Sequence, residues 1–198
     1  MFQFPNAASG LKKIFIGQML AIAGTLLMFV PLINIVGLFA VLASVIMNFI
    51  GIMDAAKDDA GYRKALSYTI IQFLLSLLQF FLAENSIVYR LVDLADSIFG
   101  LMVLYHICHT TAKLLRIQHA NDIAAEGRRV WDINIKCIAA AVLCTLICFI
   151  PLVNIIAALA LIVIAIVTIY AAVLYIIFIY HSYRRLEVPF YTDQPYLY

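Results

Sequence analysis

The sequence predicts an all-α fold, a polytopic membrane bundle of six transmembrane helices arranged as three helical hairpins. Composition is the first reason, because 66% of the residues are hydrophobic and only 12% are charged, whereas soluble domains average about 25% charged residues. The second reason is the length of the stretches that lack charge. The third is a turn motif that occurs twice, once toward each end of the chain.

Four stretches contain no Asp, Glu, Lys or Arg, namely 14–53, 65–83, 97–112 and 137–183. A helix crosses the hydrocarbon layer of a bilayer with about 20 apolar residues. The first and last stretches are long enough for two crossings each and the second for one, while the third needs flanking polar residues to reach across. We therefore expect one membrane domain over 1–198, with a cytoplasmic tail at 182–198. The expected spans are about 13–31, 34–55, 65–83, 88–112, 133–151 and 154–181.

The turn motif is a nonamer that reads FVPLINIVG at 29–37 and FIPLVNIIA at 149–157. Proline lacks an N–H and ends the preceding helix, and the asparagine three residues later is expected to cap the next helix. The four turn residues are Pro31, Asn34, Pro151 and Asn154. Two crossings separate the first and last hairpins, which therefore enter the membrane in the same direction as a parallel repeat. An alternative for the two asparagines is a polar ring at a pore mouth.

Positive charges are divided unequally between the two ends of the expected helices. Only Arg90 falls on the side of the hairpin tips. The other twelve are Lys12, Lys13, Lys57, Arg63, Lys64, Lys113, Arg116, Arg128, Arg129, Lys136, Arg184 and Arg185. By the positive-inside rule, this asymmetry predicts that both termini lie in the cytoplasm. On the same side, Gly61 is expected to end the second helix, and 116–132 is expected to continue as short helix.

The fourth span carries the candidate polar site, because Arg90, Asp93 and Asp96 precede its short apolar run and His106 and His109 follow it. The two aspartates lie three residues apart, on one helical stripe. Arg90 is one turn from Asp93 and is expected to neutralise it, whereas Asp96 has no cation nearby in sequence. A carboxylate at mid-bilayer costs roughly 3 kcal/mol, so Asp96 should face a polar group of another helix or be protonated. The alternative is an interfacial carboxylate beneath the headgroups.

His106 and His109 are spaced so that their imidazoles could share a metal ion, with Cys108 nearby. Cys108, however, points to another side of the helix, and no second cluster completes four ligands. Cys144 and Cys148 form part of a stripe on the fifth span. Cys144 and Cys148 could ligate a soft metal together, but small residues at helix interfaces are normal in membranes, so that no metal site is predicted.

Three segments, GLKKIFIGQML at 10–20, PLIN at 31–34 and IGIMDAAKDDAGYRKA at 50–65, occur in this order. The arrangement resembles small multi-pass membrane proteins of bacteria that have no assigned function. It covers mainly the first hairpin and the cytoplasmic turn that follows. The resemblance implies a bacterial cytoplasmic (inner) membrane and carries no functional residue with it.

The chain contains no serine in a glycine elbow, no HExxH and no glycine-rich phosphate loop, so we expect no catalytic residue and no cofactor. The favoured interpretation is a structural, assembly or regulatory membrane subunit. Its expected partners are the lipid bilayer and either a second copy or another membrane protein, and nothing indicates nucleic acid. The alternative is a channel or transporter for a small ion or solute, and an intramembrane enzyme is a third. The apolar spans also contain Gln18, Asn48, Gln72 and Gln79. A continuous row of polar groups from Asp96 through these residues would favour transport, whereas isolated polar pairs would favour a role in helix packing.

Overall fold

The computed structural model describes residues 4–83, 86–147 and 154–188. All regular structure in these ranges is helical, which confirms the all-α class. The helices are α1 (Pro5–Met28), α2 (Asn34–Ala55), α3 (Ala60–Phe80), α4 (Ile87–Ile117), α5 (Asn121–Ile147) and α6 (Asn154–Leu186).

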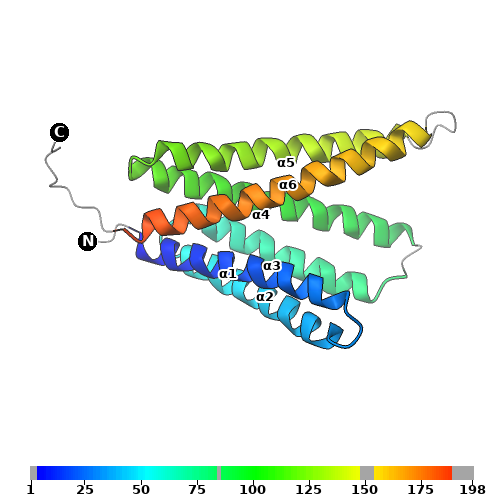
Figure 1. The fold of residues 1–198 in the computed structure, drawn as a ribbon, viewed down its shortest axis with the longest axis horizontal. Coiled ribbons are helices and arrows are strands. Elements are labelled where there is room, and N and C mark those ends of the chain that lie inside the picture. The colour runs from blue at the N-terminus through cyan, green and yellow to red at the C-terminus, as the bar shows by residue number, and fades with distance from the viewer. Residues whose placement is uncertain (1–3, 84–85, 148–153, 189–198) are drawn as a thin grey trace, which may run out of the picture.

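Consecutive helices pack as three antiparallel pairs, α1 with α2, α3 with α4 and α5 with α6 (Figure 1). The pairs gather at the end that holds both termini and fan out toward the opposite end. The buried core follows this shape, because its largest members lie near the gathered end. These include Leu11, Tyr62, Leu115, Phe178 and Leu186. The charge-rich ends of the helices are thus the most tightly packed part of the molecule.

Three helices of the described chain are long and apolar enough to cross a membrane. They are α1, α2 and the Leu159–Leu186 part of α6. Large apolar side chains are also exposed along them, including Phe39 at 65% and Ile166 at 62% of their surface. Apolar surface on this scale suits a lipid environment, so the chain is a membrane protein.

The α1–α2 contact depends on small residues that recur every seven positions. Gly10, Gly17 and Gly24 of α1 face Gly51, Ser44 and Gly37 of α2 in antiparallel order. A Cβ added at Gly10 would lie 2.4 Å from the Gly51 carbonyl oxygen, and one added at Gly24 would lie 2.8 Å from the Gly37 carbonyl oxygen. Only glycine permits backbones to approach this closely, a device common between membrane helices.

The first repeated turn is described, and it corrects one expectation. α1 ends at Met28, Pro31 lies in the connecting turn, and α2 begins at Asn34. Ile33 occupies the N-cap position and no side chain caps the helix, so the expectation that Asn34 caps α2 was wrong. Asn34 is instead one residue farther along, as the first helical residue. Pro151 and the second turn lie outside the described residues, although α6 likewise begins at its asparagine, Asn154.

Two helix boundaries differ from the sequence-based expectation, and a third expectation is met in part. α2 ends at Ala55, and Gly61 lies in the first turn of α3 instead of ending α2, because Asp59 caps α3 by accepting the Gly61 N–H at 2.7 Å. α6 continues to Leu186 and so includes the start of the expected tail. Most of 116–132 is helical as expected, but it belongs to the end of α4, which runs to Ile117, and to the start of the long helix α5, which begins at Asn121.

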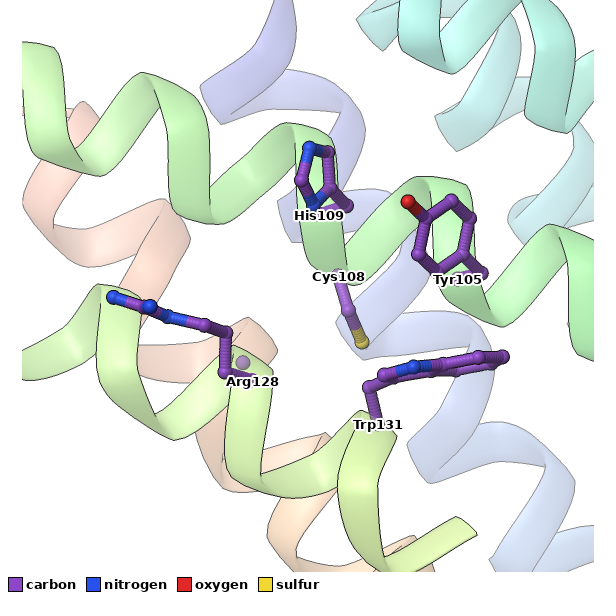
Figure 2. A pocket seen from close by; sticks show the side chains of 6 residues that line it. Tyr105, Cys108, His109, Arg128 and Trp131 are labelled. Atoms are coloured by element: carbon purple, nitrogen blue, oxygen red, sulfur yellow. The ribbon is translucent and has the colours of Figure 1, made fainter. Parts of the chain in front are cut away.

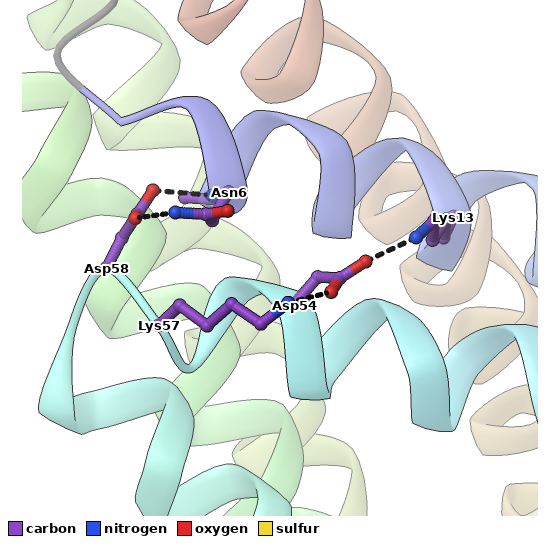
Figure 3. Close-up of polar contacts among 6 residues, drawn as sticks. Asn6, Lys13, Asp54, Lys57 and Asp58 are labelled. Atoms are coloured by element: carbon purple, nitrogen blue, oxygen red, sulfur yellow. Dashed lines mark hydrogen bonds and ion pairs between the residues drawn. The ribbon is translucent and has the colours of Figure 1, made fainter.

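Acidic residues at the end of α2 and in the α2–α3 connection form polar contacts with α1 at the gathered end (Figure 3). Asp54 near the end of α2 forms ion pairs with Lys13 of α1 and, at 2.7 Å, with Lys57. Asp58 accepts hydrogen bonds from the α1 residues Asn6 and Ala7, each at 2.7 Å. These carboxylates bind the first helix pair to the connection that leads into the second pair.

Candidate functional site

The polar residues of α4 meet a matching row of polar residues on α3. Gln79 donates a hydrogen bond to Asp93 at 3.4 Å, and one turn farther along Ser76 donates to Asp96 at 3.2 Å. The next position pairs Gly100 with Gln72, whose amide nitrogen would lie 2.9 Å from an added Cβ. We call these six residues the α3–α4 polar track. Because α3 and α4 run antiparallel, the track steps inward from the Phe80 end of α3, by roughly 6 Å per four residues.

The polar track is open along one side. Asp93 and Ser76 are exposed, and Asp96 is half-buried. Among the described residues, the side-chain hydrogen-bond partners of the two aspartates, Ser76 and Gln79, belong to α3, within the same helix pair. The sequence-based expectation that Asp96 faces a polar group of another helix therefore has a structural counterpart in Ser76. The structure does not show the expected neutralisation of Asp93 by Arg90. Arg90 is exposed and forms no ion pair within the described residues.

Apolar packing closes the track at its inner end. Beyond Gly100 and Gln72, the same interface holds Ala65 and Ile107, which are 0% and 3% exposed. Polar contact resumes one turn farther along, where the Tyr62 hydroxyl and the Thr111 hydroxyl lie 2.6 Å apart. Burial raises the pKa of Tyr62 far above its ordinary value, so its hydroxyl is protonated at any physiological pH. Buried apolar residues thus separate the polar track from the Tyr62–Thr111 hydrogen bond.

Gln18 and Asn48 form another isolated pair, in which the Gln18 amide donates to the Asn48 oxygen at 3.3 Å. This bond joins α1 and α2, next to the close approach of Gly17 to Asn48. It does not connect with the α3–α4 polar track. An apolar cleft of about 520 Å³ lies between the α1–α2 helix pair and the α3–α4 helix pair. It is lined by α2 and α3, and its walls include Phe49, Ile70 and Phe73.

His106 and His109 belong to an aromatic cluster on α4, of which Figure 2 shows His109, Tyr105 and Trp131. Tyr68 of α3 stacks on His106 with ring centroids 5.4 Å apart, and Tyr105 stacks on His109 at the same distance. Tyr105 also meets the ring of Trp131, on α5, edge to face at 5.0 Å. The cluster joins α3, α4 and α5 through ring contacts, each of which contributes about 0.5–1.5 kcal/mol beyond area burial.

A small cavity of about 30 Å³ lies beside this cluster, between α4 and α5. Tyr105, Cys108, His109, Arg128 and Trp131 line it (Figure 2). Its volume suits one water molecule and no larger ligand. In the described part of the chain, no group of three His, Cys, Asp or Glu side chains converges. Cys108 is buried and Cys144 is half-buried, and Cys148 lies outside the described residues.

The sequence analysis missed Ser76 of the polar track and two further sets of residues. His181 of α6 pairs with Glu126 of α5 at 3.1 Å, and no local spacing could have revealed a contact between residues 55 positions apart. The small residues of the α1–α2 contact did leave a signal, the seven-residue spacing from Gly10 to Gly24 and from Gly37 to Gly51. That period marks one face of each helix.

Comparison of the chain with protein-family models, with curated proteins and with solved structures found no match. The functional argument therefore depends on the geometry described above.

Proposed function

We propose that the chain is a six-span protein of the bacterial cytoplasmic membrane, with both termini in the cytoplasm and the first and last hairpins as a parallel repeat. Three of its helices have the length and apolarity of membrane spans. At about 1.5 Å per residue, α3, α4 and α5 are each at least ~30 Å long, enough to cross the same layer. The gathered end carries the positive charges, and α2 and α6 both begin at the asparagine of the repeated motif.

Cysteine labelling tests this topology. In a background with the four native cysteines replaced by alanine, Leu32→Cys places a thiol at a position 94% exposed in the first turn. Ala125→Cys places one at an exposed position near the start of α5. A membrane-impermeant maleimide should label the first from outside intact cells and the second only after permeabilisation. The reverse pattern, or labelling of both from one side, would contradict the proposed orientation.

Within the membrane, we propose that the protein is a non-catalytic assembly or regulatory subunit. The observation that carries this proposal is the open side of the α3–α4 polar track, where Asp93 and Ser76 are exposed and Asp96 is half-buried. In the proposed topology this side faces the outer half of the bilayer. Ionisable residues there are costly unless another polar group covers them. A helix of a second copy, or of another membrane protein, would cover the track.

A photo-reactive amino acid at Ser76 tests for that partner. Irradiation in native membranes should link this position to a second copy or to another protein, and the mass of the product distinguishes the two. The matched control is Ile166, which is 62% exposed on α6 beside the exposed apolar side chains of Val163 and Ile169. Products at position 76 that are no more abundant than those at position 166 would argue against a partner at the polar track.

Transport of a small ion is the second candidate, and one observation favours it. The Asp93, Asp96 and Gln72 side chains extend the polar track inward from the tip of the α3–α4 pair. Such a track could serve as the outer half of a pathway. Buried Ala65 and Ile107 interrupt it, so that transport would require these helices to separate.

A further inference from the structure

A second cleft, away from the polar track, lies at the terminal end of α6. It has a volume of about 630 Å³ and is lined by Ile123 of α5 together with the last turns of α6 and the two residues that follow. Its polar walls are His181, Arg184, Arg185 and Glu187. This volume is in the range of sites that hold small molecules.

The cleft has an excess of positive charge, because its acidic neighbours are already paired. Glu187 forms an ion pair with Lys12 of α1 at 3.0 Å, and Glu126 of α5 pairs with His181 at 3.1 Å. Arg184 and Arg185 are both exposed. Over the described ranges, no carboxylate lies within ion-pair distance of either guanidinium. Two guanidinium groups that line one cleft and have no carboxylate partner in the described chain are suited to a phosphate, to which each can donate in a bidentate manner.

The apolar walls of the cleft indicate which kind of phosphate it takes. Tyr180 and Val188 are 39% and 51% exposed at the cleft, beside Ile123. The candidate membrane span of α6 ends at Leu186, between the two arginines and Val188. In the proposed topology, on which this inference rests, the cleft is therefore level with the cytoplasmic surface of the membrane, where a tyrosine ring and arginines commonly meet lipid headgroups.

We propose that this cleft binds an anionic phospholipid, with the lipid phosphate at Arg184 and Arg185 and the adjoining part of the lipid against Tyr180, Val188 and Ile123. Paired cations and an apolar wall at the end of a membrane span are the features that such a lipid requires. A free phosphate would use the two arginines but would gain nothing from the apolar wall.

Native mass spectrometry of the full chain in detergent tests the proposal, with phosphatidylglycerol and phosphatidylcholine as probes. The wild type should retain phosphatidylglycerol in preference. Arg184→Gln together with Arg185→Gln should weaken that binding roughly 30-fold, as the loss of two surface cations implies. The matched control is Arg128→Gln together with Arg129→Gln, an adjacent exposed pair on α5 that does not line this cleft. It makes the same change in net charge and should leave the preference intact.

Two further measurements separate the sources of affinity. Ile123→Trp narrows the cleft without changing its charge and should also reduce phosphatidylglycerol retention, whether or not the arginine variant folds. Millimolar inorganic phosphate should displace little of the lipid. The proposal is overturned if the wild type shows no preference, if both arginine pairs behave alike, if Ile123→Trp binds as the wild type does, or if inorganic phosphate displaces the lipid completely. The last result would indicate a site for a free anion.

Discussion

Asp58, in the connection between α2 and α3, accepts the backbone N–H of Ala7 in the first turn of α1 at 2.7 Å. Its other oxygen accepts a hydrogen bond from the Asn6 side chain, also at 2.7 Å (Figure 3). Phe4, at the N-cap position, provides no side-chain cap. A residue 51 positions later in the chain therefore caps α1, and its negative charge also suits the positive end of the helix dipole.

Replacing Asp58 with alanine should lower the free energy of unfolding by about 1–2 kcal/mol, because it removes the cap and leaves the Ala7 N–H without its partner. Unfolding in mixed detergent micelles, followed by circular dichroism, measures the change. Asp58→Asn should cost less, since its amide oxygen can still accept the Ala7 N–H. The control is Asp132→Ala, at an exposed aspartate on α5. Equal effects at positions 58 and 132 would rule out a specific capping role.

The glycines of the α1–α2 contact should not tolerate even one added methyl group. A Cβ at Gly10 would lie 2.4 Å from the Gly51 oxygen and 2.7 Å from the Ala55 nitrogen. These are backbone atoms, so the two helices would have to move apart. Gly10→Ala should therefore destabilise the protein by about 1–3 kcal/mol, despite the higher helix propensity of alanine. The same detergent unfolding assay applies.

Gly100→Ala is the matched control for that substitution. A Cβ at Gly100 would come closest to the Gln72 amide nitrogen, 2.9 Å away at the flexible end of a side chain. Gln72 can turn aside, so the helix propensity of alanine should make this change neutral or slightly stabilising. If the two alanine variants are equally stable, the close α1–α2 approach does not contribute as described.

Stability should fall in acid partly through Asp59, which caps α3 and binds Lys113 of α4 at 2.7 Å. Burial alone would raise the pKa of Asp59, but the hydrogen bonds from Lys113 and the Gly61 N–H outweigh it and hold the pKa below its ordinary value. A carboxyl group whose pKa is lowered by folding stabilises the protein above its unfolded pKa of about 4. This contribution is lost as the pH falls through the folded-state pKa.

Asp59→Asn should therefore be less stable than the wild type at pH 7, and the difference should shrink as the pH is lowered below about 4. Unfolding midpoints measured from pH 7 to pH 3 provide the comparison. A difference that is constant over this range would show that the ionised Asp59–Lys113 pair contributes no pH-dependent stability.

The sequence predicted the helical class and the first turn because those depend on local rules. Long apolar runs specify helices in a membrane, and Pro31 cannot continue the helix that ends at Met28. The capping of α1 by Asp58 could not be predicted, because it depends on how two helices approach in space. The same reason explains why Arg90 was matched with Asp93. Spacing along one helix identified Arg90 as a neighbour of Asp93. In the structure, Asp93 instead accepts a hydrogen bond from the amide of Gln79 on α3.

Several members of the candidate site were predictable from the sequence, but Ser76 and the pairing across the two helices were not. Asp96 and Gln72 stand out in the sequence as polar residues beside or within apolar runs. The antiparallel register of α3 and α4 decides that Ser76 is the partner of Asp96 and that Gly100 lies against Gln72. A serine within an apolar helix gives no signal of its own, because its hydroxyl can also bond within its helix, as Ser76 does with the Gln72 carbonyl oxygen at 3.1 Å.

Substitutions of Asp96 distinguish assembly from transport. Asp96→Asn keeps an oxygen that can accept the Ser76 hydrogen bond, and it should leave both the fold and any subunit association intact. Asp96→Leu removes that acceptor. The single hydroxyl hydrogen of Ser76, which lies within reach of both Asp96 and the Gln72 carbonyl oxygen, can then go to Gln72 alone, so the loss within the α3–α4 pair should be only about 0.6 kcal/mol. Because a leucine suits lipid better than a carboxylate, this variant should remain folded but associate less. Cross-linking from position 76 and light scattering in detergent would measure association.

The same variants in liposomes test for ion movement. If the polar track serves assembly, vesicles containing the wild type should show no more proton or potassium flux than empty vesicles. A pH-sensitive dye follows the flux, and a potassium ionophore serves as the control. Flux in the wild type that Asp96→Asn abolishes, with unchanged association, would instead favour transport. In that case the carboxylate itself must be required, because asparagine keeps the shape and the hydrogen bond of Asp96 but cannot carry its charge or exchange its proton.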